Sequence, residues 1–313
     1  MNLKPAFLVG SALVVIGLGA FGLTEMLHTS SSGRIDWLER NAYEVFPETV
    51  REKAGDLVHL QGDIEVRSPV TDPDTGLVFE ALLVKRDVQI YQWVEDYDDE
   101  TYTDRDGNEK KRRVYSYARR WVSSPVKSYD FHDPRYTNYG ELPFREATFR
   151  SGEANLESIP LSAEVTRLAV SELGQQSLDP ERLDISTLSS RWSGVLRPDG
   201  RYLVTALSPR IGDIRVSYSA VIPARVSVIA QYAEGALRPY ASSVDPDERG
   251  IGYAEVMRGD KALSEMLGAS RSRSGIWAWV FRVLSAAMIA GGAVLMGLNR
   301  PQGAGNKVAA ARG

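Results

Sequence analysis

Residues 91–121 read YQWVEDYDDETYTDRDGNEKKRRVYSYARRW, a stretch in which a block of acids is followed at once by a block of bases. Eight acids lie between Glu95 and Glu109, and six bases lie between Lys110 and Arg120. The Asp-Gly-Asn sequence at 106–108 is typical of a tight turn, and the aromatic and β-branched residues on either side are typical of strands. The two blocks are therefore predicted to form a hairpin in which their opposite charges pair.

A loop of three residues, 106–108, sets the predicted register of this hairpin. In this register, residues of opposite charge face each other across the hairpin, and aromatic residues face aromatic residues. A two-residue turn would instead set Asp104 against Glu109. The predicted pairs are Arg105 with Glu109, Asp104 with Lys110, Glu95 with Arg119, Tyr97 with Tyr117 and Trp93 with Trp121. Bases beside aromatic residues are also found where proteins bind nucleic acid or anionic lipid. Because the acid block offers the bases a partner within the chain, no nucleic-acid partner is predicted.

Two apolar segments of membrane-spanning length lie near the chain ends. The first, AFLVGSALVVIGLGAFGL at 6–23, has eighteen residues without a charge. That is about 27 Å of helix at ~1.5 Å per residue, and the run exceeds the ~7–15 apolar residues usual in a cleaved signal peptide, which is the alternative. The second segment, at 276–298, begins near Trp277 and Trp279, as expected of an interfacial aromatic belt. Its Arg282 is predicted to extend to the lipid headgroups.

Small residues recur on one face of the second segment, at spacings of four, three and four. They are Ala286, Ala290, Ala293 and Gly297. Such a face lets another helix approach closely, so it is predicted to pack against a helix, with a homo-oligomer among the expected assemblies. Small residues that are merely tolerated in lipid would give the same pattern.

The bases near the chain ends predict the orientation of the chain in the membrane. Lys4, Arg300, Lys307 and Arg312 flank the apolar segments on their outer sides, against Arg271 and Arg273 on the inner side. By the positive-inside rule both ends face the cytoplasm. The predicted organisation is a cytoplasmic tail at 1–5, a transmembrane helix at 6–23, an extracytoplasmic or lumenal domain at 24–275, a transmembrane helix at 276–298 and a cytoplasmic tail at 299–313.

The large middle domain alternates turn signals with short apolar runs. Strands are predicted at 78–84, 87–94, 113–122, 201–207, 214–221 and 225–233, and helices at 35–46, 162–173 and 252–267. The predicted fold class is therefore α+β: a membrane-anchored, mainly antiparallel β domain with a few helices, bracketed by two transmembrane helices.

No motif of an enzyme, a cofactor site or a metal site survives inspection. The chain has no cysteine, and its three histidines are His28, His59 and His132. A GxGxxG string at 17–22 lies inside an apolar run with no preceding strand, and the Asp-rich turn near 104–109 fails the spacing of a calcium loop. His59 alternates like a strand residue, and His132 lies in a polar loop between Asp130 and Asp133. The prediction is a protein that is not an enzyme and has no catalytic residue, cofactor or metal.

An ordered set of strings carries a family resemblance. GDLVHLQGDI (55–64), VKRDVQIYQWVED (84–96), RDGNEKKRRVYSYARRW (105–121), GDIRVSYS (212–219) and a final Trp-containing span together resemble the transmembrane protein 43 (LUMA) family. The residues that carry this motif, predicted to be a structural hairpin, are Tyr91, Trp93, Glu95, Tyr115, Tyr117 and Trp121. The resemblance implies a membrane protein with a large lumenal or extracytoplasmic domain. Eukaryotic relatives are associated with the endoplasmic reticulum and nuclear envelope, with membrane organisation and protein complexes, and with no enzymatic activity.

One departure from the family shapes the functional prediction. Such relatives carry several carboxy-terminal spans, whereas one is found here, which predicts a compact bacterial member in the inner membrane without nuclear partners. The favoured function is a membrane-organising scaffold whose external domain binds proteins or the membrane surface. One alternative is a ligand sensor with an aromatic-lined pocket that uses Tyr129, Tyr136 or Tyr139. The other is a hydrolase in which His59 or His132 meets a carboxylate.

Overall fold

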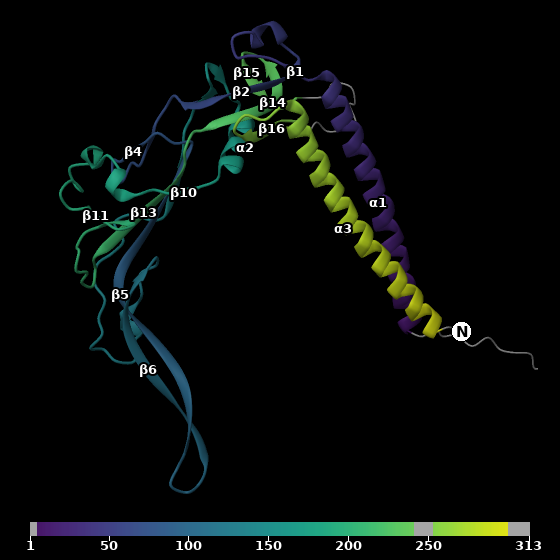
Figure 1. Ribbon diagram of the computed structural model, residues 1–313. Coiled ribbons are helices and arrows are strands. Elements are labelled where there is room, and N and C mark those ends of the chain that lie inside the picture. The colour runs from purple at the N-terminus through teal and green to yellow at the C-terminus, as the bar shows by residue number, and fades with distance from the viewer. Residues whose placement is uncertain (1–4, 241–252, 300–313) are drawn as a thin grey trace, which may run out of the picture. The chain divides into compact units, whose positions relative to one another are not determined.

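The computed structural model describes residues 5–240 and 253–299, drawn as a ribbon in Figure 1. The chain forms two units: a helical unit made of Met1–Glu44 and Lys261–Gly313, and a β unit made of Val45–Asp260. Lys4 and the basic residues beyond position 299 lie outside the described residues.

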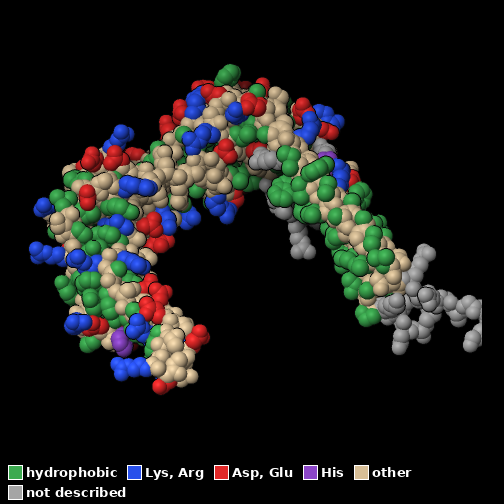
Figure 2. All heavy atoms as spheres, turned by 60° about the horizontal axis from the view of Figure 1, so that its bottom comes forward, with side chains coloured by type: hydrophobic (Ala, Val, Ile, Leu, Met, Phe, Trp, Pro, Cys, Tyr) green, Lys and Arg blue, Asp and Glu red, His purple; other side chains and the backbone are tan. Residues whose placement is uncertain are grey.

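The helical unit is a pair of long helices, α1 (Pro5–Asn41) and α3 (Leu263–Leu298). In the chain, α1 comes before the β unit and α3 comes after it. Both are long and apolar enough to cross a membrane, and in Figure 2 hydrophobic side chains cover most of their visible surface. At 37 and 36 residues they are longer than the segments predicted at 6–23 and 276–298. A bilayer core of ~30 Å takes about 20 helical residues, so each helix continues for several turns beyond it.

Glycines allow the two helices to touch through their backbones. A Cβ atom added to Gly292 would lie 2.5 Å from the carbonyl oxygen of Gly10, and one added to Gly10 would lie 2.7 Å from that of Gly292. Seven residues along α1, a Cβ on Gly17 would lie 2.7 Å from Ile289. Small residues at a helix crossing give close backbone packing where the lipid offers no hydrophobic driving force.

The β unit contains two large antiparallel sheets and a separate two-stranded one. The first has the strand order β15 (Ala236–Arg238), β14 (Arg225–Ala233), β2 (Leu57–Val66), β8 (Ala154–Leu156), β9 (Ile159–Pro160), with β16 (Glu255–Arg258) also on β14. Helix α2 (Ala163–Leu173) buries Val165, Ala169 and Leu173 in the same core as the buried residues of β2 and β14. The Ser162 hydroxyl caps this helix by accepting from the Val165 N–H at 3.3 Å.

The second sheet carries the long hairpin. Its order is β11 (Arg197–Asp199), β12 (Tyr202–Val204), β13 (Ile214–Val221), β5 (Leu83–Thr103), β6 (Glu109–Val122), with β10 (Gln176–Ser177) on β13 and β7 (Ala147–Arg150) on β5. β5 pairs with β13 only as far as Ile90 and with β6 from Ile90 onward. Figure 1 accordingly shows β5 and β6 continuing as a two-stranded ribbon beyond the other strands of this sheet. The remaining short elements are β1 (Tyr43–Glu44), the pair β3 (Val70–Thr71) and β4 (Val78–Phe79), and 3₁₀ turns at Val50–Lys53, Ser128–Asp130, Pro180–Arg182 and Ile185–Thr187.

A buried ion pair lies in the core of the second sheet. Arg86 of β5 has a side chain only 2% exposed, and it donates to Asp72 at 2.5 Å and Asp74 at 2.7 Å. The hydroxyl of Tyr218 donates to the other oxygen of Asp72 at 2.6 Å, and the guanidinium also donates to the Arg145 carbonyl. The rings of Phe144 and Phe149 lie over the guanidinium. Every charge in this cluster therefore has a partner, as a buried charge requires.

The predicted elements are confirmed where pattern and tertiary structure agree. β13, β14 and α2 coincide with the predictions at 214–221, 225–233 and 162–173 to within one residue. The prediction of a helix at 252–267 is wrong in its first half, because Glu255–Arg258 pair with β14 as a strand. The helix predicted at 35–46 is also wrong in part, because α1 ends at Asn41. The strands predicted at 87–94 and 113–122 are pieces of longer ones.

Candidate functional site

The hairpin at 91–121 is present, but its register differs from the predicted one by two residues. The observed pairs are Thr103 with Glu109, Tyr102 with Lys110, Glu95 with Tyr117, Trp93 with Arg119 and Tyr91 with Trp121. The predicted pairs of Arg105 with Glu109, Asp104 with Lys110, Glu95 with Arg119, Tyr97 with Tyr117 and Trp93 with Trp121 are therefore wrong as direct partners.

The turn explains this shift. The loop is 105–107, with Asp104 and Asn108 joined by a hydrogen bond of 2.9 Å between Asn108 O and Asp104 N. Gly107 is at its third position with φ +85°, the left-handed conformation that this class of three-residue loop requires and that glycine tolerates best. A loop at 106–108 would have put Asn108 in that conformation. Oδ1 of Asp104 further fixes the turn by accepting from the N–H groups of Asp106 and Asn108, each at 2.9 Å.

The two charge blocks do satisfy each other, as the sequence predicts. Arg113 bonds to Asp99 at 3.1 Å and Arg112 to Glu100 at 3.0 Å, and both pairs are directly opposite across the ribbon. Lys110 reaches Asp104 diagonally at 2.7 Å, which lowers the pKa of Asp104. These pairs are solvent-exposed, so they specify the geometry of the ribbon rather than the stability of the unit.

The six motif residues of the hairpin share one face. All have odd numbers, and residues two apart in a strand point to the same side. On that face Tyr91 packs on Trp121 with ring centroids 5.0 Å apart, and Arg215 of β13 lies over Trp121 at 4.7 Å. The even-numbered face carries mostly charged and small side chains over its distal half. The motif is therefore an aromatic row along one side of the ribbon.

The loop at 123–146 lies on this aromatic face and is held there by stacking. Tyr136 stacks on Tyr117 with centroids 3.9 Å apart, and His132 stacks on Tyr115 at 4.2 Å. Glu95 accepts two hydrogen bonds of 2.6 Å, from the Tyr117 hydroxyl and from the His132 N–H. Loss of water around Tyr117 and its bond to Glu95 raise the pKa of Tyr117 to about 12. Glu95 thus joins the ribbon to the loop.

Asn138 of the same loop covers one edge of β5. Its side-chain oxygen accepts from the Trp93 N–H at 2.7 Å, and its side-chain NH₂ donates to the Trp93 carbonyl at 2.9 Å. One amide side chain thereby replaces the next strand at the point where β13 ends. Gln92, which is buried, accepts from the Val126 N–H at 2.7 Å and fixes the start of the loop. Neither role has a signal in the sequence, because both depend on a loop that returns across the ribbon.

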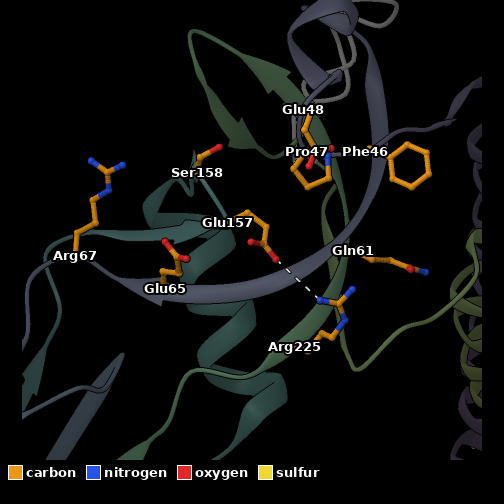
Figure 3. Close-up of a pocket in the computed structure, with 9 residues that line it drawn as sticks. All are labelled: Phe46, Pro47, Glu48, Gln61, Glu65, Arg67, Glu157, Ser158 and Arg225. Carbon is orange, nitrogen blue, oxygen red and sulfur yellow. Dashed lines mark ion pairs between the residues drawn. The ribbon is translucent and has the colours of Figure 1, made fainter.

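A second candidate is a polar hollow of about 550 Å³ on the first sheet, shown in Figure 3. Arg225 lies at one side of it, 3.2 Å from Asp63, 2.7 Å from Asp260 and 4.0 Å from Glu157. Glu157 has a φ of +53° and accepts from the Asp63 N–H at 2.8 Å. Gly62 makes room for it, since a Cβ there would lie 2.8 Å from the Glu157 side chain. The hollow is lined by Phe46, Pro47, Glu48, Gln61, Glu65, Arg67, Glu157, Ser158 and Arg225.

The chemistry of this hollow is that of a surface ion-pair network. Arg225, its principal cation, is shared among three carboxylates. Over the described parts of the chain, no cluster of three histidine or acidic side chains has the arrangement of a metal site.

The predicted hydrolase residues lie in unsuitable places. His59 is buried in β2 opposite Ile229 of β14, as expected of a strand residue in a core. His132 is stacked on Tyr115, and its neighbour Asp133 is bound by Arg135 at 2.6 Å, a bond that lowers the pKa of Asp133 to about 2. Asp133 is thus a weak proton acceptor at neutral pH.

The other residues singled out in the sequence lie on the membrane helix α3. Arg282 does not extend alone toward headgroups: its guanidinium forms two hydrogen bonds with the carboxylate of Glu25 on α1, at 2.5 and 2.9 Å. An ion pair at the edge of an apolar span lowers the cost of holding both charges there. Ala286, Ala290, Ala293 and Gly297 are exposed, because α3 meets α1 through a different face that includes Ser285 and Gly292. The small-residue face stays a predicted packing surface for a further helix.

Comparison with known sequences decides the family. The sequence model described as transmembrane protein 43 matches residues 90–298, which is more than half of the chain.

The chain belongs to the transmembrane protein 43 family.

Relatives within the family are similar over most of this chain. The transmembrane protein 43 homolog of Drosophila melanogaster is 27% identical over 287 residues, covering 89% of this chain and 73% of the relative. Transmembrane protein 43 of Homo sapiens is 27% identical over 217 residues, covering 65% of this chain and 52% of the relative, and that of Mus musculus is 26% identical over 307 residues, covering 91% and 72%. No solved structure matches the chain. The family match begins at Ile90, the residue at which β5 leaves β13 and the ribbon starts.

Proposed function

We propose that this membrane protein of the transmembrane protein 43 family is a non-enzymatic scaffold that organises other proteins in the membrane through its β unit. The observation that carries the proposal is the use made of the family motif. Tyr91, Trp93 and Tyr117 build the ribbon and hold a loop against it. Tyr117 also lines an open hollow of about 460 Å³, together with charged residues such as Arg113 and Asp133. A long, charged ribbon is suited to contact with proteins.

A ligand-binding function has less support. The tyrosines that could have lined a pocket are distributed otherwise: Tyr136 stacks on Tyr117 and meets Trp93 edge to face, while Tyr129 and Tyr139 are 77% and 63% exposed. Small-molecule sites are mostly apolar and concave. The hollow of Figure 3 is lined chiefly by charged and polar side chains.

The proposed placement of the scaffold follows the positive-inside rule, with both chain ends in the cytoplasm and the β unit on the extracytoplasmic or lumenal side. In a bacterial cell this is the inner membrane, and in eukaryotic relatives it is the endoplasmic reticulum or nuclear envelope. The exposed face of Ala286, Ala290, Ala293 and Gly297 supports self-association in the membrane as part of the same function.

Crosslinking in native membranes tests the scaffold. A chemical crosslinker followed by identification of attached proteins is expected to recover further copies of the chain and a reproducible set of membrane proteins. Replacing Ala290 and Ala293 with Leu should weaken the oligomer, because bulky side chains separate the helices. Ala287→Leu with Gly291→Leu is the matched control, since both residues are exposed on another side of α3. A chain that is monomeric and uncrosslinked in its native membrane would refute the scaffold.

A further inference from the structure

The distal part of the ribbon has two strand edges along which residues 5–240 and 253–299 place no partner strand. β6 is the last strand of its sheet, and along its fourteen residues the described chain supplies a neighbour on the β5 side alone. β5 pairs with β13 up to Ile90, and Asn138 then covers Trp93. From Glu95 to Thr103 the described residues place no strand along that edge of β5.

The backbone groups of these edges point outward at odd-numbered residues. Tyr91 shows this, because its N–H donates to the Asp213 carbonyl at 2.8 Å and its carbonyl accepts from the Gly212 N–H at 2.9 Å, on the side away from β6. In an antiparallel pair, residues whose backbone groups face away from the partner alternate with those that face it. The odd-numbered residues of distal β5 and of β6 therefore offer N–H and C=O groups to a further strand.

The two edges carry opposite charges that the ribbon does not fully neutralise. On β5, Asp98 is opposite Val114, and on β6, Lys111 is opposite Thr101. In the described structure neither Asp98 nor Lys111 belongs to an ion pair, in contrast to Asp99. The acidic edge of one ribbon is therefore complementary in charge to the basic edge of another.

We propose that the ribbon pairs edge to edge with the ribbon of a second copy of this chain, acidic β5 against basic β6. The inference rests on the proposed scaffold function and names one of its partners. Two ribbons lying side by side with their tips in the same direction bring β5 of one antiparallel to β6 of the other. Pairing β6 with β6 would instead set bases against bases, which is unfavourable.

The same edge-to-edge contact can repeat from one copy of the chain to the next. Because the contact joins two different edges, each added copy leaves one acidic and one basic edge free, so the assembly grows as a row rather than closing as a dimer. Basic residues on an edge strand can also serve to prevent pairing. Prevention of pairing does not account for the acidic residues of β5. Two basic edges would repel another copy of the chain, whereas an acidic edge and a basic edge attract each other.

Engineered disulfides test the pairing directly, because the chain has no cysteine of its own. Chains with Asp98→Cys and one affinity tag are expressed in the same membrane as chains with a cysteine at Arg112, Val114 or Ser116 and a second tag. Even-numbered residues form the non-hydrogen-bonded pairs of the new contact, where side chains are closest. Mild oxidation is expected to give a mixed disulfide dimer for one of the three positions.

Control chains separate the outcomes. Lys111→Glu in the β6-cysteine chain should lower the yield of the mixed dimer at least several-fold, because it puts like charges together while leaving the ion pairs of the ribbon in place. A Val114→Cys dimer formed without the Asp98→Cys chain would overturn the inference in favour of β6 against β6, and a disulfide-bonded complex with a different protein would assign the edge to another partner.

A chemical crosslinker, used beside the cysteine pairs, separates the ribbon contact from the scaffold function. If a chemical crosslinker joins the two tagged chains but no cysteine pair does, the ribbon does not mediate the contact and the scaffold stands. If the two tagged chains and other membrane proteins are all left unlinked, both proposals fail.

Discussion

At the scale of single residues, the β unit depends on the pair formed by Arg86 and Asp72. Burial alone would raise the pKa of Asp72, but the hydrogen bonds from Tyr218 and Arg86 outweigh it and hold this pKa below its usual value. A carboxyl whose pKa is lowered by folding contributes stability above its unfolded pKa and loses it as the pH falls through the folded one. Removing one partner of a buried pair costs about 3–5 kcal/mol.

Asp72→Asn is therefore expected to lower the free energy of unfolding of the β unit at pH 7 by about 3 kcal/mol or more. The loss relative to the natural chain should shrink as the pH falls below about 4, where the natural carboxyl begins to protonate in the unfolded chain. Urea unfolding of the full chain in detergent, followed by tryptophan fluorescence at several pH values, measures both effects. Asp98→Asn, an exposed acid outside any described ion pair, is the control, and an equal loss in both variants would contradict the account.

The contact between the ribbon and its loop rests on the hydroxyl of Tyr117. It donates to Glu95 and accepts from the Asp133 N–H at 2.9 Å. Tyr117→Phe should weaken this contact and speed hydrogen exchange at the amides of His132 and Asp133, because Asp133 loses its acceptor and Glu95, the acceptor of His132, loses a partner. Tyr129→Phe, at an exposed tyrosine, should leave that exchange unchanged. Unaltered protection in Tyr117→Phe would mean that ring stacking alone holds the loop.

Residue-level detail was the least predictable part of the candidate site. The alternation of the motif and the opposite charges indicated a hairpin, and those signals are local. The register was wrong by two because charge complementarity tolerates several registers, whereas the positive φ of Gly107 allows one. Asn138 and Glu95 form hydrogen bonds with residues more than twenty positions away in the sequence. Nothing in the sequence of β5 or β6 predicts these partners.

At the scale of elements, the crossing of α1 and α3 depends on Gly292. Gly292→Leu should force the helices apart, because even a Cβ atom there would lie 2.5 Å from the Gly10 carbonyl oxygen. Gly291→Leu is the matched control, since a Cβ on Gly291 meets nothing within 4 Å. The thermal midpoint of the purified protein in detergent, followed by circular dichroism, should fall by several degrees in the first variant only. Equal midpoints would show that the two helices do not need this contact.

Element boundaries were predictable where one physical signal acts alone. β13 and β14 have regular apolar patterns between turns, and Ser162 marks the start of α2. The segment at 252–267 misled because Val256 and Met257 fit an amphipathic helix as well as a strand, and only pairing with β14 chooses between them. The sequence does not predict the ion pair of Arg282, because its partner, Glu25, lies on the other helix, 257 positions earlier in the chain.

At the scale of the whole molecule, the orientation in the membrane is the prediction with the widest consequence. A protease added outside sealed cells or spheroplasts is expected to degrade the β unit while leaving tags at Met1 and Gly313 intact, because the positive-inside rule predicts that both ends face the cytoplasm. Immunoblotting of the two tags and of the β unit reads out the result. Cleaved tags beside an intact β unit would reverse the orientation, and a mature chain beginning near residue 21 would show a signal peptide instead.

The ion pair between Glu25 and Arg282 can form only late in the synthesis of the chain. Glu25 is made early and Arg282 late, with the entire β unit between them, so α1 must wait in the membrane without its partner while more than two hundred residues are synthesised. A nascent chain halted before α3 would leave Glu25 unpaired and the Gly10 surface bare. Both contacts can therefore form only after the carboxy-terminal helix has been made.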